Sequence, residues 1–326
     1  MGKIRANTVA TLAAFAVLVL LLTNPARYIE SVKTGLLLFA NNVLPSLFPF
    51  LFLTKFLTMQ GACERTVGFF RPVMKLYRCP PAGGYVFFMS ILSGYPIGAK
   101  VASDLAAQGV LSPADCKKIL SFSSTSGPFF VIGTVGALML GSAKAGWLML
   151  AAHVLSALLA GLLFCRLSGK SETPPAILPE KQYSDALSAS VYDSILSVMN
   201  IGGFITLFYV LIDMIAATRL LLPANHLLAA LFSAIRLPAE LAEPICFGIV
   251  EITRGCSMLA GTNAPLAAKA ICCCFLISFG GLSINAQALT YVRKCGVSVG
   301  TYFLQKILHC ALSVPIALGL FSLFGV

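Results

Sequence analysis

Long apolar stretches, each broken by short polar and glycine-rich segments, constrain this chain more than any other feature. Several of them approach the roughly 20 apolar residues that are needed to cross a bilayer. Hydrophobic residues make up 58% of the chain and charged residues 11%, whereas a soluble domain carries roughly 25% charged residues. The stretches are too long and too little alternating for barrel strands. The sequence therefore predicts an all-α polytopic membrane protein.

The two halves of the chain resemble each other at an offset of 157 residues. The matches fall at the breaks: Gly98 aligns with Gly255, Ser121 with Ser278, Phe122 with Phe279, and Ser126 with Ser283. Related halves with matching breaks are typical of secondary transporters whose substrate site lies at the repeat interface. We therefore expect an N-terminal transmembrane helix and loop (1–33), a first repeat (34–167), a polar cytoplasmic linker (168–190) and a second repeat (191–326).

The N-terminal apolar run resembles a signal peptide, because Lys3 and Arg5 precede it. Cleavage is the alternative, but no small-x-small site ends the run, so a retained first helix is expected over 8–23. Each repeat is then expected to contain one span, an interfacial helix, a hairpin, a broken span and a last span. In the first repeat these five segments are expected over 34–58, 62–80, 83–108, 117–140 and 145–167. In the second repeat they are expected over 191–217, 219–237, 240–261, 266–291 and 297–324.

Two of these segments are expected to be re-entrant hairpins. Ser93-Gly94-Tyr95-Pro96 divides 83–108 into halves too short to span alone; a single kinked spanning helix is the alternative. The second hairpin, 240–261, breaks near 248–255. Two further spans are broken, at SFSSTSGP and SFGGLSIN. A break of this kind is tolerated only where protein or a wet cavity surrounds it.

Basic residues favour a cytoplasmic N-terminus. With re-entrant hairpins each repeat crosses three times, so the repeats are inverted relative to each other and the chain crosses seven times. The inner loops then hold thirteen basic residues: Lys3, Arg5, Arg65, Arg71, Lys75, Arg78, Lys117, Lys118, Arg166, Lys170, Lys181, Arg293 and Lys294. The outer loops hold six: Arg27, Lys33, Lys144, Arg219, Arg236 and Lys269. This bias predicts an external C-terminus.

Charges inside membrane segments are costly and are therefore candidates for function. Lys100 and Asp104 lie four residues apart in the first hairpin, and Glu251 and Arg254 lie three apart in the second. Two alternatives are open for these residues. The acid and the base of each hairpin pair only with each other, or one member of each pair faces the substrate or a coupling cation or proton. The other charges within or beside the spans are expected near span ends, where they can snorkel: Lys55, Asp213, Glu243 and Lys306.

The polar breaks offer hydroxyl groups, an asparagine amide and freed backbone groups to a ligand, and half-helix N-termini favour anions. Alternatively, the serines bond back to their own helices. No residue pattern supports catalysis or a cofactor. Eleven cysteines without a CxxC and three scattered histidines (His153, His226 and His309) predict no metal site. The net charge of +11 lies mostly in loops, which argues against nucleic-acid binding.

An ordered set of motifs spans about residues 35–326: NNVLPSLFPFLFLTKFL, SGYPIGAK, SFSSTSGPFFVIGTVG, EITRG and SFGGLSINAQ. The set resembles the YlbJ-type family of sporulation integral membrane proteins. That family belongs to the nucleoside-recognition gate domain group and is related to concentrative nucleoside transporters. The resemblance implies an inverted repeat with two re-entrant hairpins and two broken helices, and a homo-oligomer. It also implies export of dipicolinic acid from the mother cell toward the forespore, across the outer forespore membrane.

The resemblance and the breaks together give a set of candidate substrate-binding residues: Ser93, Gly94, Tyr95, Lys100, Ser123, Ser124, Thr125, Ser126, Gly127, Glu251, Thr253, Arg254, Ser283 and Asn285. Dipicolinate carries two carboxylates, for which Lys100 and Arg254 are the expected buried cations. A nucleoside or other neutral solute is the alternative substrate, and Glu251 and the serines would then matter more. A membrane protein of spore assembly that transports nothing is the second alternative.

Overall fold

The computed structural model describes residues 2–167 and 185–326, which form helices and loops and no strand. The first part contains α1 (Gly2–Thr23), α2 (Pro25–Leu38), the π-helix η1 (Phe39–Val43), α3 (Leu44–Met59), α4 (Ala62–Leu76), α5 (Ala82–Ser93), α6 (Ile97–Ala107), α7 (Pro113–Leu120), the π-helix η2 (Phe129–Met139) and α8 (Ala143–Leu167). The second contains α9 (Ala186–Ala217), α10 (Leu222–Ala234), the 3-10 turn η3 (Ala239–Leu241), α11 (Ala242–Val250), α12 (Ile252–Ala260), α13 (Leu266–Phe279), α14 (Gly281–Lys294) and α15 (Val299–Leu323).

The expected order of segments is therefore present in both halves, with two corrections. Residues 25–33 are helical rather than a loop, because Asn24 caps α2 by accepting from the backbone N–H of Arg27 and Pro25 occupies its first turn. Helix α9 begins at Ala186 rather than at 191, because Asp185 caps it. Most of the expected linker, 168–184, lies outside the described residues.

Equivalent helices of the two halves run antiparallel to each other. Helix α8 packs along α15 with Lys144 Nζ donating to the Phe324 carbonyl at 3.0 Å, while the rings of His153 and His309 meet near the middle. The α2–α3 segment packs along α9 in the same manner, because Arg27 pairs with Asp213 and Lys55 pairs with Asp193. Opposed directions are what a two-fold axis in the membrane plane produces.

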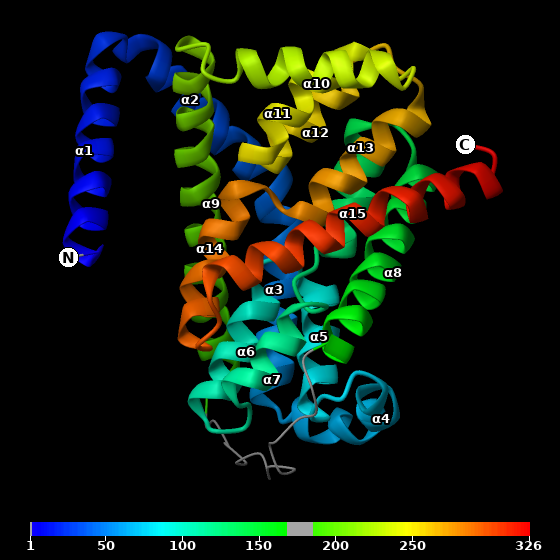
Figure 1. The fold of residues 1–326 in the computed structure, drawn as a ribbon. Helices are drawn as coiled ribbons and strands as arrows, with labels where there is room; N and C mark the ends of the chain where they lie inside the picture. Colours follow the sequence, from blue (N-terminus) through cyan, green and yellow to red (C-terminus); the bar gives the residue numbers. More distant parts are fainter. Residues whose placement is uncertain (1, 168–184) are drawn as a thin grey trace.

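Short peripheral helices lie at opposite ends of this bundle. Figure 1 shows α10 lying across the top, above α11 and α12, and α4 at the bottom. Apolar side chains on both are exposed, among them Phe69 on α4 and Leu227 and Leu231 on α10. These are the two segments that the sequence predicts to be interfacial.

Four helical segments of the described residues are long and apolar enough to cross a membrane by themselves: α8, α9, the α13–α14 pair and α15. A fifth span results if Ala14–Thr23 and Pro25–Val43, which are bent by 109°, are counted as one. Seven crossings require in addition that α2–α3 is a span separate from α1 and that the interrupted α7–η2 segment spans. The number seven therefore stays a prediction.

We expect the end of α8 and the C-terminus to face opposite sides of the membrane. Lys144 at the start of α8 contacts Phe324, and the 25 residues of α8 rise about 37 Å, more than the ~30 Å hydrocarbon core. Cysteines replacing Leu167 and Leu323, whose side chains are 88% and 76% exposed, should be labelled by an impermeant thiol reagent from the cytoplasmic and external sides, respectively. Labelling of both from one side would contradict the inverted arrangement.

Candidate functional site

Each of the four expected interruptions is present, and each begins a new half-helix. Gly94-Tyr95-Pro96 joins α5 to α6, residues 121–128 join α7 to η2, Glu251 joins α11 to α12, and Gly280 joins α13 to α14. Gly94 and Gly280 have φ angles of +76° and +86°. Side chains with a Cβ rarely adopt this backbone conformation, so glycine makes both turns possible.

Three of the four breaks meet around one narrow cavity of about 50 Å³, and α14, which follows the fourth, adds to its wall. The polar and glycine residues of its wall come from the two hairpin turns, from the 121–128 break and from α14: Gly94, Tyr95, Ser126, Gly127, Glu251, Thr253 and Gln287. The apolar wall comes mainly from α2–α3, α9 and η2: Val43, Leu47, Phe130, Ile201, Ile205, Ile252 and Ile284. Equivalent elements of the two halves therefore contribute to a single site.

Six of the candidate residues line this cavity: Gly94, Tyr95, Ser126, Gly127, Glu251 and Thr253. Other residues of the 121–128 break are held by protein partners instead. Ser123 Oγ donates back to the Ile119 carbonyl at 2.7 Å, Ser124 bonds to the Tyr302 hydroxyl, and Thr125 bonds to Ser90. Ser123 thus bonds back to its own helix, which is the alternative to a role in substrate binding.

Ser93, Ser283 and Asn285 are buried but do not line the cavity. Ser93 bonds to the Thr54 hydroxyl. Asn285 Nδ2 donates to the Phe279 carbonyl at 3.1 Å and so closes the α13–α14 break. Within the described part of the chain, Ser283 Oγ and Asn285 Oδ1 have no hydrogen-bond partner.

His153 connects the two broken helices. Its Nε2 accepts the backbone N–H of Ser126 at 2.9 Å, and its Nδ1 lies 2.9 Å from Ser278 Oγ. A nitrogen that accepts a hydrogen bond carries no proton, so the imidazole is neutral and Nδ1 donates to the serine. The ring of His309, 4.7 Å away between centroids, lies beside it, and its Nε2 is 3.0 Å from the His153 carbonyl. One imidazole thus holds both breaks together.

Lys306 is fully buried in α15, which corrects the expectation that it lies near a span end. Its Nζ donates to the Ser124 carbonyl at 3.1 Å and to the Tyr95 hydroxyl. The amine also lies 4.4 Å from the centroid of the Tyr95 ring. Because Tyr95 lines the cavity, the lysine is one side chain away from it.

Neither hairpin contains an ion pair between its own two charged residues. The alternative in which Lys100 pairs with Asp104 and Glu251 pairs with Arg254 is therefore wrong. Glu251 accepts the backbone N–H of Arg254 at 2.8 Å and caps α12, whereas the Arg254 guanidinium is 3.6 Å from Asp213 on α9. Lys100 donates to Ser197 at 3.4 Å, in a pocket that it shares with Asp104. The pairings were not predictable from spacing because the acceptors come from α9.

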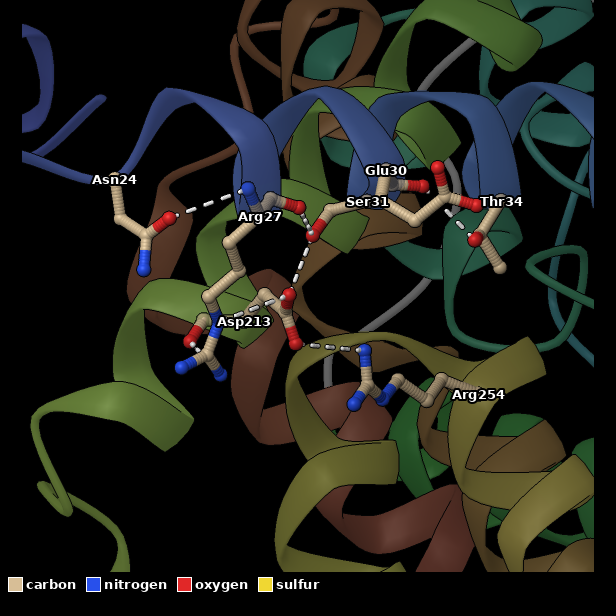
Figure 2. Close-up of polar contacts among 7 residues, drawn as sticks. All are labelled: Asn24, Arg27, Glu30, Ser31, Thr34, Asp213 and Arg254. Atoms are coloured by element: carbon tan, nitrogen blue, oxygen red, sulfur yellow. Dashed lines mark hydrogen bonds and ion pairs between the residues drawn. The ribbon is translucent and has the colours of Figure 1, made fainter. Parts of the chain in front are cut away.

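Asp213 joins three helices at the edge of an open cleft of about 570 Å³. Figure 2 shows its carboxylate between Arg27 and Ser31 of α2 and Arg254 of α12. The Arg254 guanidinium also lies over the rings of Tyr209 and Phe247, at 4.9 and 5.7 Å from their centroids. The network ties the second hairpin to the α2–α9 pair and lies outside the central cavity.

We expect Asp213→Asn to lower the melting temperature of the detergent-solubilised protein more than Asp193→Asn. The first change removes the carboxylate charge that pairs with two arginines, at a cost of about 1–3 kcal/mol. Asp193 has one partner, Lys55 at 2.9 Å, and is 37% exposed, so its loss should cost roughly 0.2–1 kcal/mol. Equal losses in the two variants would show that Asp213 does not act as a hub.

Lys306, His153 and His309 are not among the predicted site residues, although the sequence contains signals for them. Lys306 lies well inside the 297–324 stretch, and a charge at such a position is a candidate for function. The two histidines are 156 residues apart, one residue from the repeat offset. Among the residues that the structure describes, no group of three or more His, Cys, Asp or Glu side chains could hold a metal ion.

Comparison with known proteins identifies a relative by sequence and a similar fold. No protein-family model matches the sequence. The chain is 28% identical over 310 residues to the "Sporulation integral membrane protein YlbJ" of Bacillus subtilis (strain 168), covering 88% of this chain and 76% of that protein. It is therefore a homologue of that protein.

Its fold is similar to that of CNTnw, a concentrative nucleoside transporter, in an inward-facing substrate-bound state. The TM-score is 0.56 at 17% identity, and the match covers 99% of this chain and 86% of that chain. The chain is thus an integral multi-pass membrane protein whose fold is similar to that of this transporter.

Proposed function

We propose that this chain is a secondary transporter of a small anionic metabolite, and that dipicolinate, moved out of the mother cell toward the forespore, is its substrate. The observation that carries the proposal is the single cavity at which both hairpin turns and the 121–128 break meet. The homology to a sporulation membrane protein supports the setting, the outer forespore membrane of a spore-forming bacterium.

In this proposal the two halves are inverted repeats, each with one re-entrant hairpin and one broken transmembrane helix. The antiparallel course of α8 and α15, and of α2–α3 and α9, supports it. The close pairing of α5 and α6 supports a hairpin in place of one kinked span over 83–108, because a Cβ added to Gly98 would lie 2.8 Å from the Ser90 Cβ. Rocking one set of these elements against the other would expose the cavity alternately to each side.

Helix ends favour an anion in the cavity. Half-helices α6, η2 and α14 begin at the breaks without an acidic cap, so their positive dipole ends favour an anion there, whereas the Glu251 carboxylate already caps α12. Lys306 contacts Tyr95, which lines the cavity, and adds positive charge there without lining the cavity itself. We therefore assign the electrostatic role to Lys306 in place of Lys100 and Arg254, which lie in other pockets.

A nucleoside or other neutral solute is a second candidate, and a specific observation favours it. Glu251 and Gln287 line the cavity, and a carboxylate repels an anion unless a proton or a cation lies between them. A neutral ligand that donates hydrogen bonds would meet no such repulsion. In this case Glu251 binds the substrate directly.

Flux into proteoliposomes separates these functions. The purified chain is reconstituted, and uptake of labelled dipicolinate and labelled uridine is compared with that of empty vesicles. The proposal expects saturable dipicolinate flux, inhibited by excess unlabelled dipicolinate and not by uridine. Saturable uridine flux alone would instead establish the neutral-solute function. Flux of neither compound, from protein that remains monodisperse, would favour a membrane protein of spore assembly.

A further inference from the structure

The surroundings of Lys306 contain oxygen atoms but no acid. Its side chain is 1% exposed, and none of the four ion pairs found among the described residues includes it. Its partners are the Ser124 carbonyl and the Tyr95 hydroxyl. A buried cation without a carboxylate is expensive, so these oxygens must stabilise it through their dipoles.

The amine can reach these oxygens because the helices are interrupted. Ser124 lies in the non-helical 121–128 segment, where its carbonyl is freed from a helical partner. The Tyr95 hydroxyl also lies 3.3 Å from the Ile277 carbonyl and 3.4 Å from the Ser278 carbonyl, at the C-terminal end of α13. The amine therefore contacts one freed carbonyl of the first repeat directly and is linked to the C-terminal end of α13 through the Tyr95 hydroxyl.

We propose that Lys306 is a built-in cation, which holds with its own ammonium group the place that a dissociable coupling cation takes in transporters with broken helices. In such transporters, unwound carbonyls and half-helix C-terminal ends bind the coupling ion. Here α15 supplies the charge on a covalently attached side chain that cannot dissociate from the site. The inference rests on the proposed transport function and adds to it that transport needs no Na⁺. Removal of the Lys306 side chain should then leave a site that a small monovalent cation can occupy.

The first test measures stability and requires no substrate. Lys306→Ala is purified in detergent, and its melting temperature is compared in choline, Na⁺, K⁺ and methylammonium salts at equal ionic strength. We expect a lowered melting temperature in choline and a saturable recovery with methylammonium or Na⁺, while the wild type responds to none of them. Lys118→Ala is the matched control, because Lys118 is equally buried and contacts the Arg78 carbonyl at 3.4 Å, away from the cavity.

Several outcomes would overturn the inference. These are an unchanged melting temperature of Lys306→Ala in choline, no recovery with any cation, or equal recovery in Lys118→Ala. If Lys306→Ala does not fold, Lys306→Ser keeps a small polar group on α15, leaves the position of the amine open and should show the same recovery by cations. Wild-type flux that stops when Na⁺ is replaced by choline would also refute the inference. If neither dipicolinate nor uridine is transported, the proposed function fails while the stability results still decide the role of Lys306.

Discussion

Replacing Gly98 or Gly255 with alanine should strongly destabilise the protein. A Cβ at Gly98 would lie 1.8 Å from the Ser123 carbonyl oxygen, and a Cβ at Gly255 would lie 2.2 Å from the Gly248 Cα. Both obstacles are backbone atoms, so no side-chain rotation relieves the clash. Overpacking of this kind costs about 1–3 kcal/mol and sometimes more. The melting temperature and the monodisperse yield in detergent measure the effect.

Gly203→Ala and Gly300→Ala are the matched controls. Both glycines are helical, and an added Cβ would meet nothing within 4 Å. Alanine is the better helix former by up to about 1 kcal/mol, so these variants should be as stable as the parent or more stable. If Gly98→Ala and Gly255→Ala behaved like the controls, the second arms of the hairpins would not pack as described.

Filling the cavity should abolish transport while the protein stays folded. Ile205 on α9 lines the cavity and is 6% exposed, and Ile205→Phe would place a larger ring in a space of about 50 Å³. A ligand would then be forced against the ring at a cost of roughly 1–3 kcal/mol, or about a ten- to hundredfold loss in affinity. The expected result is a matching loss of flux, measured for whichever solute the wild type transports.

Leu207→Phe is the control for this prediction, because Leu207 lies on the same helix and is 50% exposed. It should retain wild-type flux and stability. Wild-type flux in a well-folded Ile205→Phe variant would place the substrate path elsewhere. A loss of flux in both variants would indicate a general effect of α9 on movement and not a blocked site.

Much of the fold was predictable because bilayer physics acts on local sequence. An apolar stretch must be helical to satisfy its backbone in lipid, and a glycine- or proline-rich polar interruption must break it. The breaks at Gly94, Glu251 and Gly280 lie within the predicted segments. The match of Gly98 to Gly255 also has a physical reason, since each lies on the second arm of a hairpin and faces close backbone or side-chain neighbours.

The electrostatics of the site were not predictable in the same way. Spacing suggested that Lys100 pairs with Asp104 and that Glu251 pairs with Arg254, but Arg254 pairs with Asp213, forty-one residues away along the chain. Lys306 was expected near a span end, yet α15 crosses the 121–128 break and carries the lysine into the centre. Partners supplied by another helix leave no trace in local spacing.

The sequence by itself determined the class of the protein, the order of its helices and the positions of its breaks, because these depend on hydrophobic length and on residues that cannot continue a helix. Only the tertiary structure decided which polar groups face the cavity and which pair with one another. Two antiparallel halves bring Tyr95, His153 and Lys306 together from three distant segments. Buried polar groups must find partners, and in this fold Lys306 and His153 find theirs partly in the opposite repeat.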